Sequence, residues 1–153
     1  MLALVATGFA QFSFAQDSKS TPESLELLSS YYNVQDALVS GNANLAATKA
    51  AEFGVIAKAL DIKTLPADSR NGLLTSADEI AKTKVLKKQR EYFATFSEQM
   101  FILAKLTKLS PEPIYKAYCP MKKAAWLSAD PAIKNPYYGS AMLTCGKVAE
   151  TIK

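Results

Sequence analysis

Apolar residues recur at three- and four-residue steps through most of the chain, and this spacing is typical of one face of an α-helix. The pattern predicts four helices, at residues 22–40, 44–60, 69–82 and 84–109. The first helix carries one apolar stripe, made of Leu27, Leu28, Tyr31, Val34 and Leu38. The fourth carries a stripe of larger side chains, Leu86, Phe93, Phe96, Met100 and Leu103. Stripes of this kind indicate helices that share one core.

Residues that cap or break helices separate these segments. Thr21 and Pro22 mark the start of the first helix, because threonine accepts a hydrogen bond from the first turn and proline fits that turn. Gly41 suits the left-handed residue that follows a helix. Because the loop after Gly41 is short, we expect the first two helices to pack antiparallel. Only Thr83 separates the third predicted helix from the fourth, so one long kinked helix is an alternative there.

Residues 114–146 form an insert that departs from this pattern. Positions 118 to 146 hold both cysteines, the only tryptophan, two of the four methionines and three of the seven prolines, a composition that favours turns. Weak alternation at 114–118 predicts a short extended segment, and 141–152 is long enough for a last short helix. We therefore expect an all-α fold with little strand. It would be an antiparallel four-helix bundle with the turn-rich insert packed on one end, in a single domain at 22–153.

The first fifteen residues are typical of a secretory signal peptide. Residues 1–15 carry no charge and are mostly apolar, and Ser13-Phe14-Ala15 places small residues where a signal peptidase reads them. A polar leader follows at 16–21. The positively charged start of a signal peptide is missing, so Met1 as the true start stays open, and a buried N-terminal helix is the alternative. We expect a periplasmic or secreted protein without an integral membrane segment in the mature chain, because the apolar stretch is short for a span.

Composition excludes several classes of site. The chain has 153 residues, 49% of them hydrophobic, and a net charge of +4, which fits one soluble domain. It contains no histidine, which excludes Ser-His-Asp and Cys-His nucleophilic sites, the usual catalytic zinc sites and His-ligated haem. The basic run at 82–90 is typical of a solvated helix face, so we expect no nucleic-acid partner. No acid–base constellation stands out, and we expect a binding module or an interaction domain in place of an enzyme.

The sulfur-bearing residues of the insert are the candidate metal ligands. Cys119 and Met121 lie two residues apart, and Met142 and Cys145 lie three apart. If the insert folds back, two thiolates and two thioethers face one point. Soft sulfur ligands select soft ions, above all copper(I) and, by the same logic, silver(I). Three supporting aromatic residues, Trp126, Tyr137 and Tyr138, would wall such a site and keep water out.

A disulfide is the alternative role for the two cysteines. In an exported protein two cysteines most often pair, and closing this loop would stabilise the fold by roughly 3.5 kcal/mol in the chain-entropy model. Met121 and Met142 would then fill space in the core. On this alternative the protein is a structural or interaction domain whose aromatic insert docks a partner protein.

The insert also resembles a known family. The motifs that carry the likeness are Cys119-Pro120-Met121, Trp126-Leu127-Ser128, Asn135-Pro136-Tyr137-Tyr138-Gly139, Met142-Leu143 and Cys145-Gly146, together with Arg90, Phe93 and Ser97. They resemble an exported bacterial family of domains of unknown function, found alone or fused to periplasmic adaptor subunits of copper/silver efflux systems.

The resemblance covers residues 31–152 and implies a periplasmic location, a helical fold, a link to heavy-metal handling and efflux adaptors as partners. It adds Asn135 to the supporting residues. Lys122 and Lys123 depart from the family's polar, glycine-containing turn and bring two positive charges beside the proposed site. We therefore expect an exported accessory domain that binds copper(I) or silver(I), with its oligomeric state left open.

Overall fold

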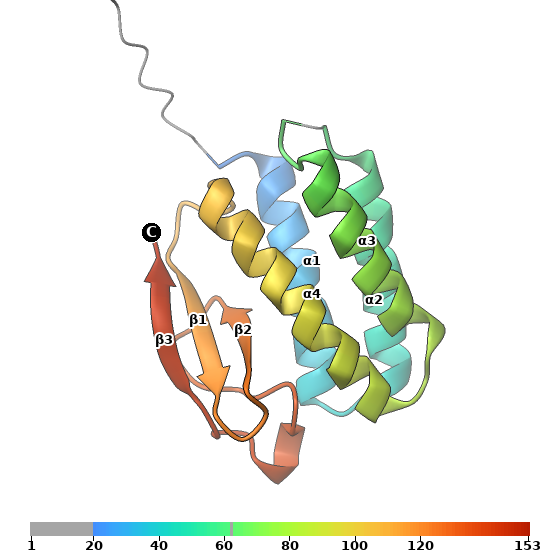
Figure 1. The fold of residues 1–153 in the computed structure, drawn as a ribbon, viewed down its shortest axis with the longest axis vertical. Helices are drawn as coiled ribbons and strands as arrows, with labels where there is room; N and C mark the ends of the chain where they lie inside the picture. Colours follow the sequence, from blue (N-terminus) through green and yellow to red (C-terminus); the bar gives the residue numbers. More distant parts are fainter. Residues whose placement is uncertain (1–19, 62) are drawn as a thin grey trace, which may run out of the picture.

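The computed structural model describes residues 20–61 and 63–153, and it consists of four helices followed by a small sheet (Figure 1). The helices are α1 (Pro22–Val39), α2 (Ala43–Ala59), α3 (Ala67–Lys82) and α4 (Leu86–Leu106). The later elements are β1 (Ile114–Cys119), β2 (Ala124–Ser128), a 3-10 helix η1 (Gly139–Ala141) and β3 (Lys147–Ile152). The four predicted helices are confirmed, with bounds close to those that the periodicity predicts. The predicted signal peptide and all but the last two residues of the leader lie outside the described residues.

Side-chain caps set the helix boundaries. Thr21 and Ser24 form a capping box at the start of α1, in which each side chain accepts a hydrogen bond from the other's backbone N–H. Asn42 caps α2 by accepting from the backbone N–H of Leu45 at 3.0 Å. Between α3 and α4 the backbone N–H of Val85 donates to the Thr83 hydroxyl at 3.2 Å. The chain therefore breaks at Thr83, and the alternative of one long kinked helix is wrong.

The helices form a bundle in which each helix packs on the next along the chain. Aromatic side chains fill its centre: Phe53 meets Phe96 edge-to-face at 4.7 Å, and Tyr31 stacks on Phe93 at 5.5 Å between ring centroids. A helical bundle is thus confirmed, while the antiparallel orientation of successive helices stays a prediction. Among the described residues, none of the helices combines the length and the apolar character that crossing a bilayer requires.

A three-stranded antiparallel sheet follows the bundle, so the all-α prediction is wrong. The strand order is β2-β1-β3, with β1 in the centre. The short extended segment predicted at 114–118 is confirmed as β1, but the helix predicted at 141–152 is absent. Gly146 has φ +145, a conformation that no helix contains. The residues after it obtain their backbone hydrogen bonds from β1, and such long-range pairing outweighs local helix propensity.

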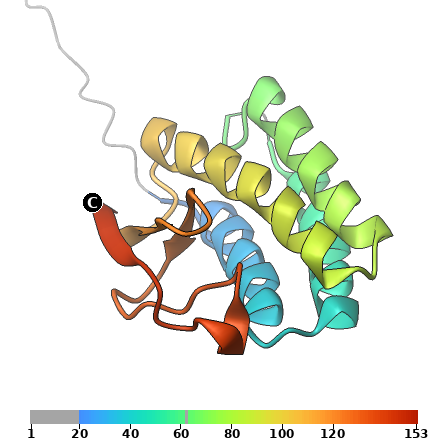
Figure 2. The same ribbon diagram turned by 60° about the horizontal axis from the view of Figure 1, so that its bottom comes forward.

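The sheet lies alongside α1 and α4, and not only at one end of the bundle as predicted (Figures 1 and 2). The Tyr31 hydroxyl is a buried polar link between the two layers. It lies 2.8 Å from the Ser97 hydroxyl of α4 and accepts a hydrogen bond from the backbone N–H of Leu127 in β2 at 3.0 Å. Trp126, the residue before Leu127 in β2, is 1% exposed. These contacts fix β2, whose first residue, Ala124, pairs with Cys119.

Candidate functional site

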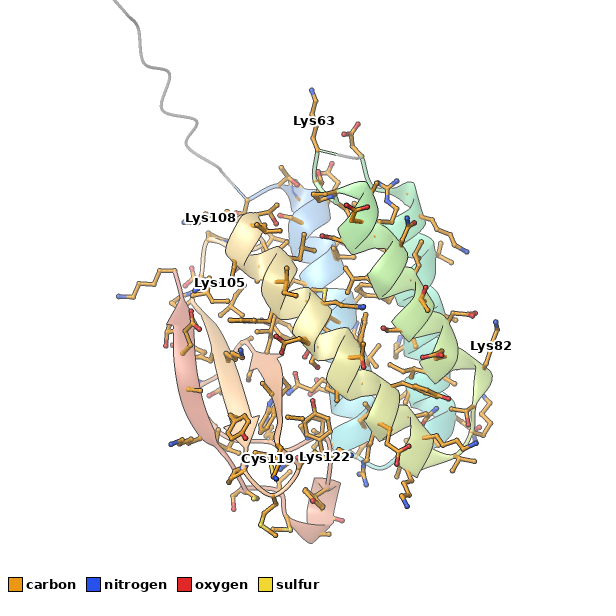
Figure 3. All side chains as sticks on the ribbon, viewed as in Figure 1. Lys63, Lys82, Lys105, Lys108, Cys119 and Lys122 are labelled. Carbon is orange, nitrogen blue, oxygen red and sulfur yellow. The ribbon has the colours of Figure 1, made fainter. Side chains whose placement is uncertain are left out.

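The two cysteines meet at one end of the sheet, where Figure 3 labels Cys119. Cys119 is the last residue of β1 and Cys145 lies two residues before β3. Their Sγ atoms are 3.6 Å apart, and both thiols are free. Cys119 is 0% exposed, whereas Cys145 is partly exposed. The fold-back that the sequence suggested therefore brings the two thiols into contact.

A tight turn between β1 and β2 shapes the surroundings of Cys119. The Cys119 carbonyl accepts a hydrogen bond from the backbone N–H of Lys123 at 2.8 Å, and Lys123 has a left-handed backbone with φ +56. This turn directs the backbone N–H groups of Met121 and Lys122 toward the Cys119 sulfur. Lys122, labelled beside Cys119 in Figure 3, thus contributes its backbone to the site.

Asn135 fixes the segment that carries Cys145, the second cysteine of the pair. It is completely buried, and its Nδ2 donates to the Cys145 carbonyl at 2.7 Å. Its Oδ1 accepts from the backbone N–H of Tyr137 at 2.9 Å, and its own N–H donates to the Leu143 carbonyl at 2.8 Å. The backbone N–H of Cys145 donates to the Met142 carbonyl at 3.1 Å. One side chain therefore ties the 135–139 turn to the segment that carries Cys145.

Hydrogen bonding makes the two thiols unequal. Burial raises the pKa of Cys119, but the donors around its sulfur outweigh that effect and lower the pKa below its ordinary value. The strongest of these donors is the Lys122 N–H, followed by the Asn135 side chain and the Cys145 thiol. The hydrogen bond to Cys119 raises the pKa of Cys145, and burial adds to that rise. The first proton therefore leaves Cys119, and the Cys145 thiol donates to the resulting thiolate.

The two methionines lie in the segments that carry the cysteines. Met121 is in the turn after Cys119 and is 65% exposed. Met142 is half-buried and bonded through its backbone to Cys145. The described residues include no cluster of three or more histidine, cysteine, aspartate or glutamate side chains that could hold a metal ion. Participation of the two thioethers in one site with the thiols stays a prediction.

The supporting aromatic residues form the inner wall of this region. Trp126 and Tyr137 are buried and meet edge-to-face at 6.0 Å, and the Tyr137 hydroxyl donates to the Ala125 carbonyl at 2.5 Å. Burial raises the pKa of Tyr137. A Cβ on Gly146 would lie 3.0 Å from the Trp126 ring, so the indole packs directly on the backbone beside Cys145. Tyr138 is half-buried.

One face of α4 supports the insert, through three residues spaced as a helical stripe. Arg90 donates from Nη2 to the Leu38 carbonyl at the end of α1, at 3.0 Å. Phe93 packs on the Tyr137 ring at 5.9 Å, and Ser97 holds the Tyr31 hydroxyl. The sequence predicted Tyr31 and Phe93 as core residues alone, and it pointed to Arg90 and Ser97 only through the family resemblance. The three- and four-residue spacing of Arg90, Phe93 and Ser97 was the signal that this face of α4 supports the insert.

Part of the chain matches the model of a known protein family. A model of the family described as "Protein of unknown function (DUF3347)" matches residues 27–112. The matched range includes most of α1, all of α2, α3 and α4, and stops before β1. No curated protein and no solved structure matches this chain.

Proposed function

The chain belongs to the DUF3347 family of proteins of unknown function, and we propose that it binds one soft monovalent metal ion, copper(I) or silver(I), through Cys119 and Cys145. The observation that carries this proposal is the contact of two free thiols at 3.6 Å, from segments 26 residues apart in the chain. A buried asparagine and a row of backbone N–H groups hold the pair in place. Such a prearranged pair lowers the cost of ordering two ligands around an ion.

Ligand chemistry favours copper(I) over zinc. Thiolate and thioether sulfur are the ligands that copper(I) prefers, whereas structural zinc takes four cysteine or histidine ligands. The whole chain has two cysteines and no histidine, so it lacks such a set. With metal–thiolate bonds of about 2.3 Å, the length known for zinc, sulfurs this close hold an ion off the line between them. That position leaves room for a third ligand, and the thioether of Met142 or Met121 is the candidate.

The unequal thiols fit this role. Because its pKa is lowered, Cys119 is already a thiolate at pH values below the ordinary thiol pKa. This thiolate gives an arriving cation its first ligand. Cys145, partly exposed, loses its proton when the ion binds. Copper(I) affinity should therefore fall as the pH drops through the pKa values of the pair. Lys122 and Lys123 place positive charge near the site, which opposes the binding of a cation. The backbone N–H of Lys122 nevertheless stabilises the Cys119 thiolate.

The biological setting that we propose is heavy-metal tolerance or efflux outside the cytoplasm. The apolar stretch at 1–15 with Ser13-Phe14-Ala15 supports export. The motifs of the insert resemble those of domains fused to periplasmic efflux adaptors, which makes such adaptors the proposed partners. In this setting the domain would carry the ion or hand it to the adaptor, without catalysis of its own.

A structural disulfide is the second candidate. The 3.6 Å contact favours it, because a disulfide needs the sulfurs at about 2.0 Å and little movement separates the two states. The protein would then be a stapled interaction domain. Trp126 and Tyr137 are buried, so a partner would dock elsewhere than on these two rings.

Titration of the fully reduced protein with copper(I) against a competing chelator tests the proposal. We expect one ion per chain, clear preference over zinc, a large loss of affinity in Cys119→Ser and Cys145→Ser, and a smaller loss in Met142→Leu. Met100→Leu is the matched control, because it makes the same change in the bundle core. Absence of copper(I) uptake by protein with two titratable thiols would exclude the metal site and leave the disulfide candidate.

A further inference from the structure

The two cysteines of the pair differ in their exposure to solvent. Cys119 is 0% exposed at the end of the central strand β1, while Cys145 is partly exposed in the segment between η1 and β3. They remain within 3.6 Å of one another. We propose that the pair acts as a reversible dithiol–disulfide couple with a fixed order of attack, in which Cys145 reacts with an external disulfide and Cys119 resolves the product.

The reaction is an exchange with a small-molecule or protein disulfide, written RSSR. In the first step Cys145 gives up its thiol proton and its sulfur attacks one sulfur of RSSR, which forms a Cys145–SR bond and releases one RS⁻ that takes up a proton. In the second step the Cys119 thiolate attacks the Cys145 Sγ, forms the Cys119–Cys145 bond and expels the second RS⁻. Overall, RSSR gains two electrons and two protons and leaves as two thiols. The cysteine pair loses two electrons and two protons and becomes a disulfide.

The exposure and the contacts of each cysteine determine which one reacts first with the external disulfide. Cys119 is covered by its own turn and by the β-sheet, so an incoming disulfide cannot reach its sulfur without opening the fold. The Cys145 backbone is fixed by its hydrogen bonds to Asn135 and Met142, and the residue is partly exposed to solvent. Closing the pair needs an approach from 3.6 Å to about 2.0 Å, and the rotation of one side chain supplies much of this movement.

This exchange stands independently of metal binding. If the same pair holds copper(I), its oxidation removes both thiolates and releases the ion, because a disulfide sulfur is not a thiolate ligand. Oxidation and copper loading would then exclude one another. The test below omits copper, so its failure cannot be mistaken for the failure of the proposed metal site.

Glutathione disulfide is the probe, with the products trapped by acid and located by mass spectrometry. The reduced wild-type protein should form the Cys119–Cys145 disulfide without accumulating an adduct. Cys119→Ser should retain a stable glutathione adduct on Cys145. Cys145→Ser should react at Cys119 about tenfold or more slowly while folded, and as fast as the other variant in urea, because burial is then removed.

A second measurement uses the wild-type protein alone. Brief alkylation of the folded, reduced chain should label Cys145 before Cys119. Equal or faster adduct formation at Cys119 in folded Cys145→Ser, labelling of Cys119 first, or an adduct on wild-type protein that never closes to the internal disulfide would each overturn the proposal.

Discussion

Replacement of Asn135 by alanine tests how the fold holds the cysteine pair. The side chain is completely buried and bonds both the Cys145 carbonyl at 2.7 Å and the Tyr137 N–H at 2.9 Å. It also donates toward the Cys119 sulfur. Asn135→Ala removes all three interactions without touching a proposed ligand. We expect a less stable protein in which the Cys119 pKa is higher than in the wild type.

The magnitude follows from the groups that lose their partners. The buried Tyr137 N–H, left without an acceptor, costs about 1–3 kcal/mol, and loss of the bond to the Cys145 carbonyl costs about 0.5–1.5 kcal/mol more. The total is about 1.5–4.5 kcal/mol. For a domain of this size, with a slope of about 2 kcal/mol per molar urea, the unfolding midpoint should fall by about 1–2 M.

Equilibrium urea unfolding of the reduced protein measures this change, and the ultraviolet absorbance of the thiolate reports the Cys119 pKa in the same samples. Asn71→Ala is the matched control, because Asn71 is exposed on α3 and its replacement should stay within about 0.5 kcal/mol. If Asn135→Ala were as stable as this control and its thiolate titrated as in the wild type, the role assigned to Asn135 would be wrong.

Three further predictions concern the support of the site. Trp126→Ala should lower the free energy of unfolding by about 3–5 kcal/mol, because it empties the space between sheet and helices. Tyr31→Phe should cost about 2–4 kcal/mol, because it leaves the buried Ser97 hydroxyl and a β2 N–H without a partner. Cys145→Ala should raise the Cys119 pKa, because it removes a donor to the thiolate. The lowered pKa of Cys119 gives the wild type stability that is present above the ordinary thiol pKa and is lost as the pH falls through the folded value.

Urea unfolding checks the first two of these predictions, and Leu106→Ala and Tyr92→Phe are their controls on more exposed side chains. Costs as small as those of the controls would show that the sheet is loosely attached. A thiolate titration checks the third, and an unchanged Cys119 pKa in Cys145→Ala would contradict the hydrogen bond between the thiols. The raised pKa of Cys145 has the opposite effect on the pH dependence of stability. The stability that it contributes is lost as the pH rises through the Cys145 pKa of the folded protein.

Local signals predicted the helices, and long-range pairing explains what they missed. Thr21 and Pro22 mark the start of α1, and the apolar stripes mark the buried helix faces, so the bundle was predictable from the sequence. The residues of β3 include good helix formers, and only their pairing with β1 makes them a strand. Gly146 lies within the helix predicted at 141–152, and its φ of +145 is incompatible with that helix.

The candidate site was predictable as a set of residue types and not as an arrangement. Soft-sulfur chemistry singled out Cys119 and Cys145, and the structure brings their sulfurs together. The order of β2, β1 and β3, which places the two cysteines at the same end of the sheet, follows from the whole fold. Asn135 was expected only as a supporting residue, because no local pattern shows that its side chain will also bond the Cys145 carbonyl, ten residues along the chain.

X-ray absorption spectroscopy of the reduced protein loaded with one equivalent of copper(I) tests the central claim most directly, because it reports the atoms bound to the ion. The proposed site predicts sulfur neighbours only, two from the cysteines with or without a third from a methionine, and loss of that signal in Cys119→Ser. A first shell made of nitrogen or oxygen, or a spectrum unchanged by Cys119→Ser, would contradict the assignment of the metal to this pair.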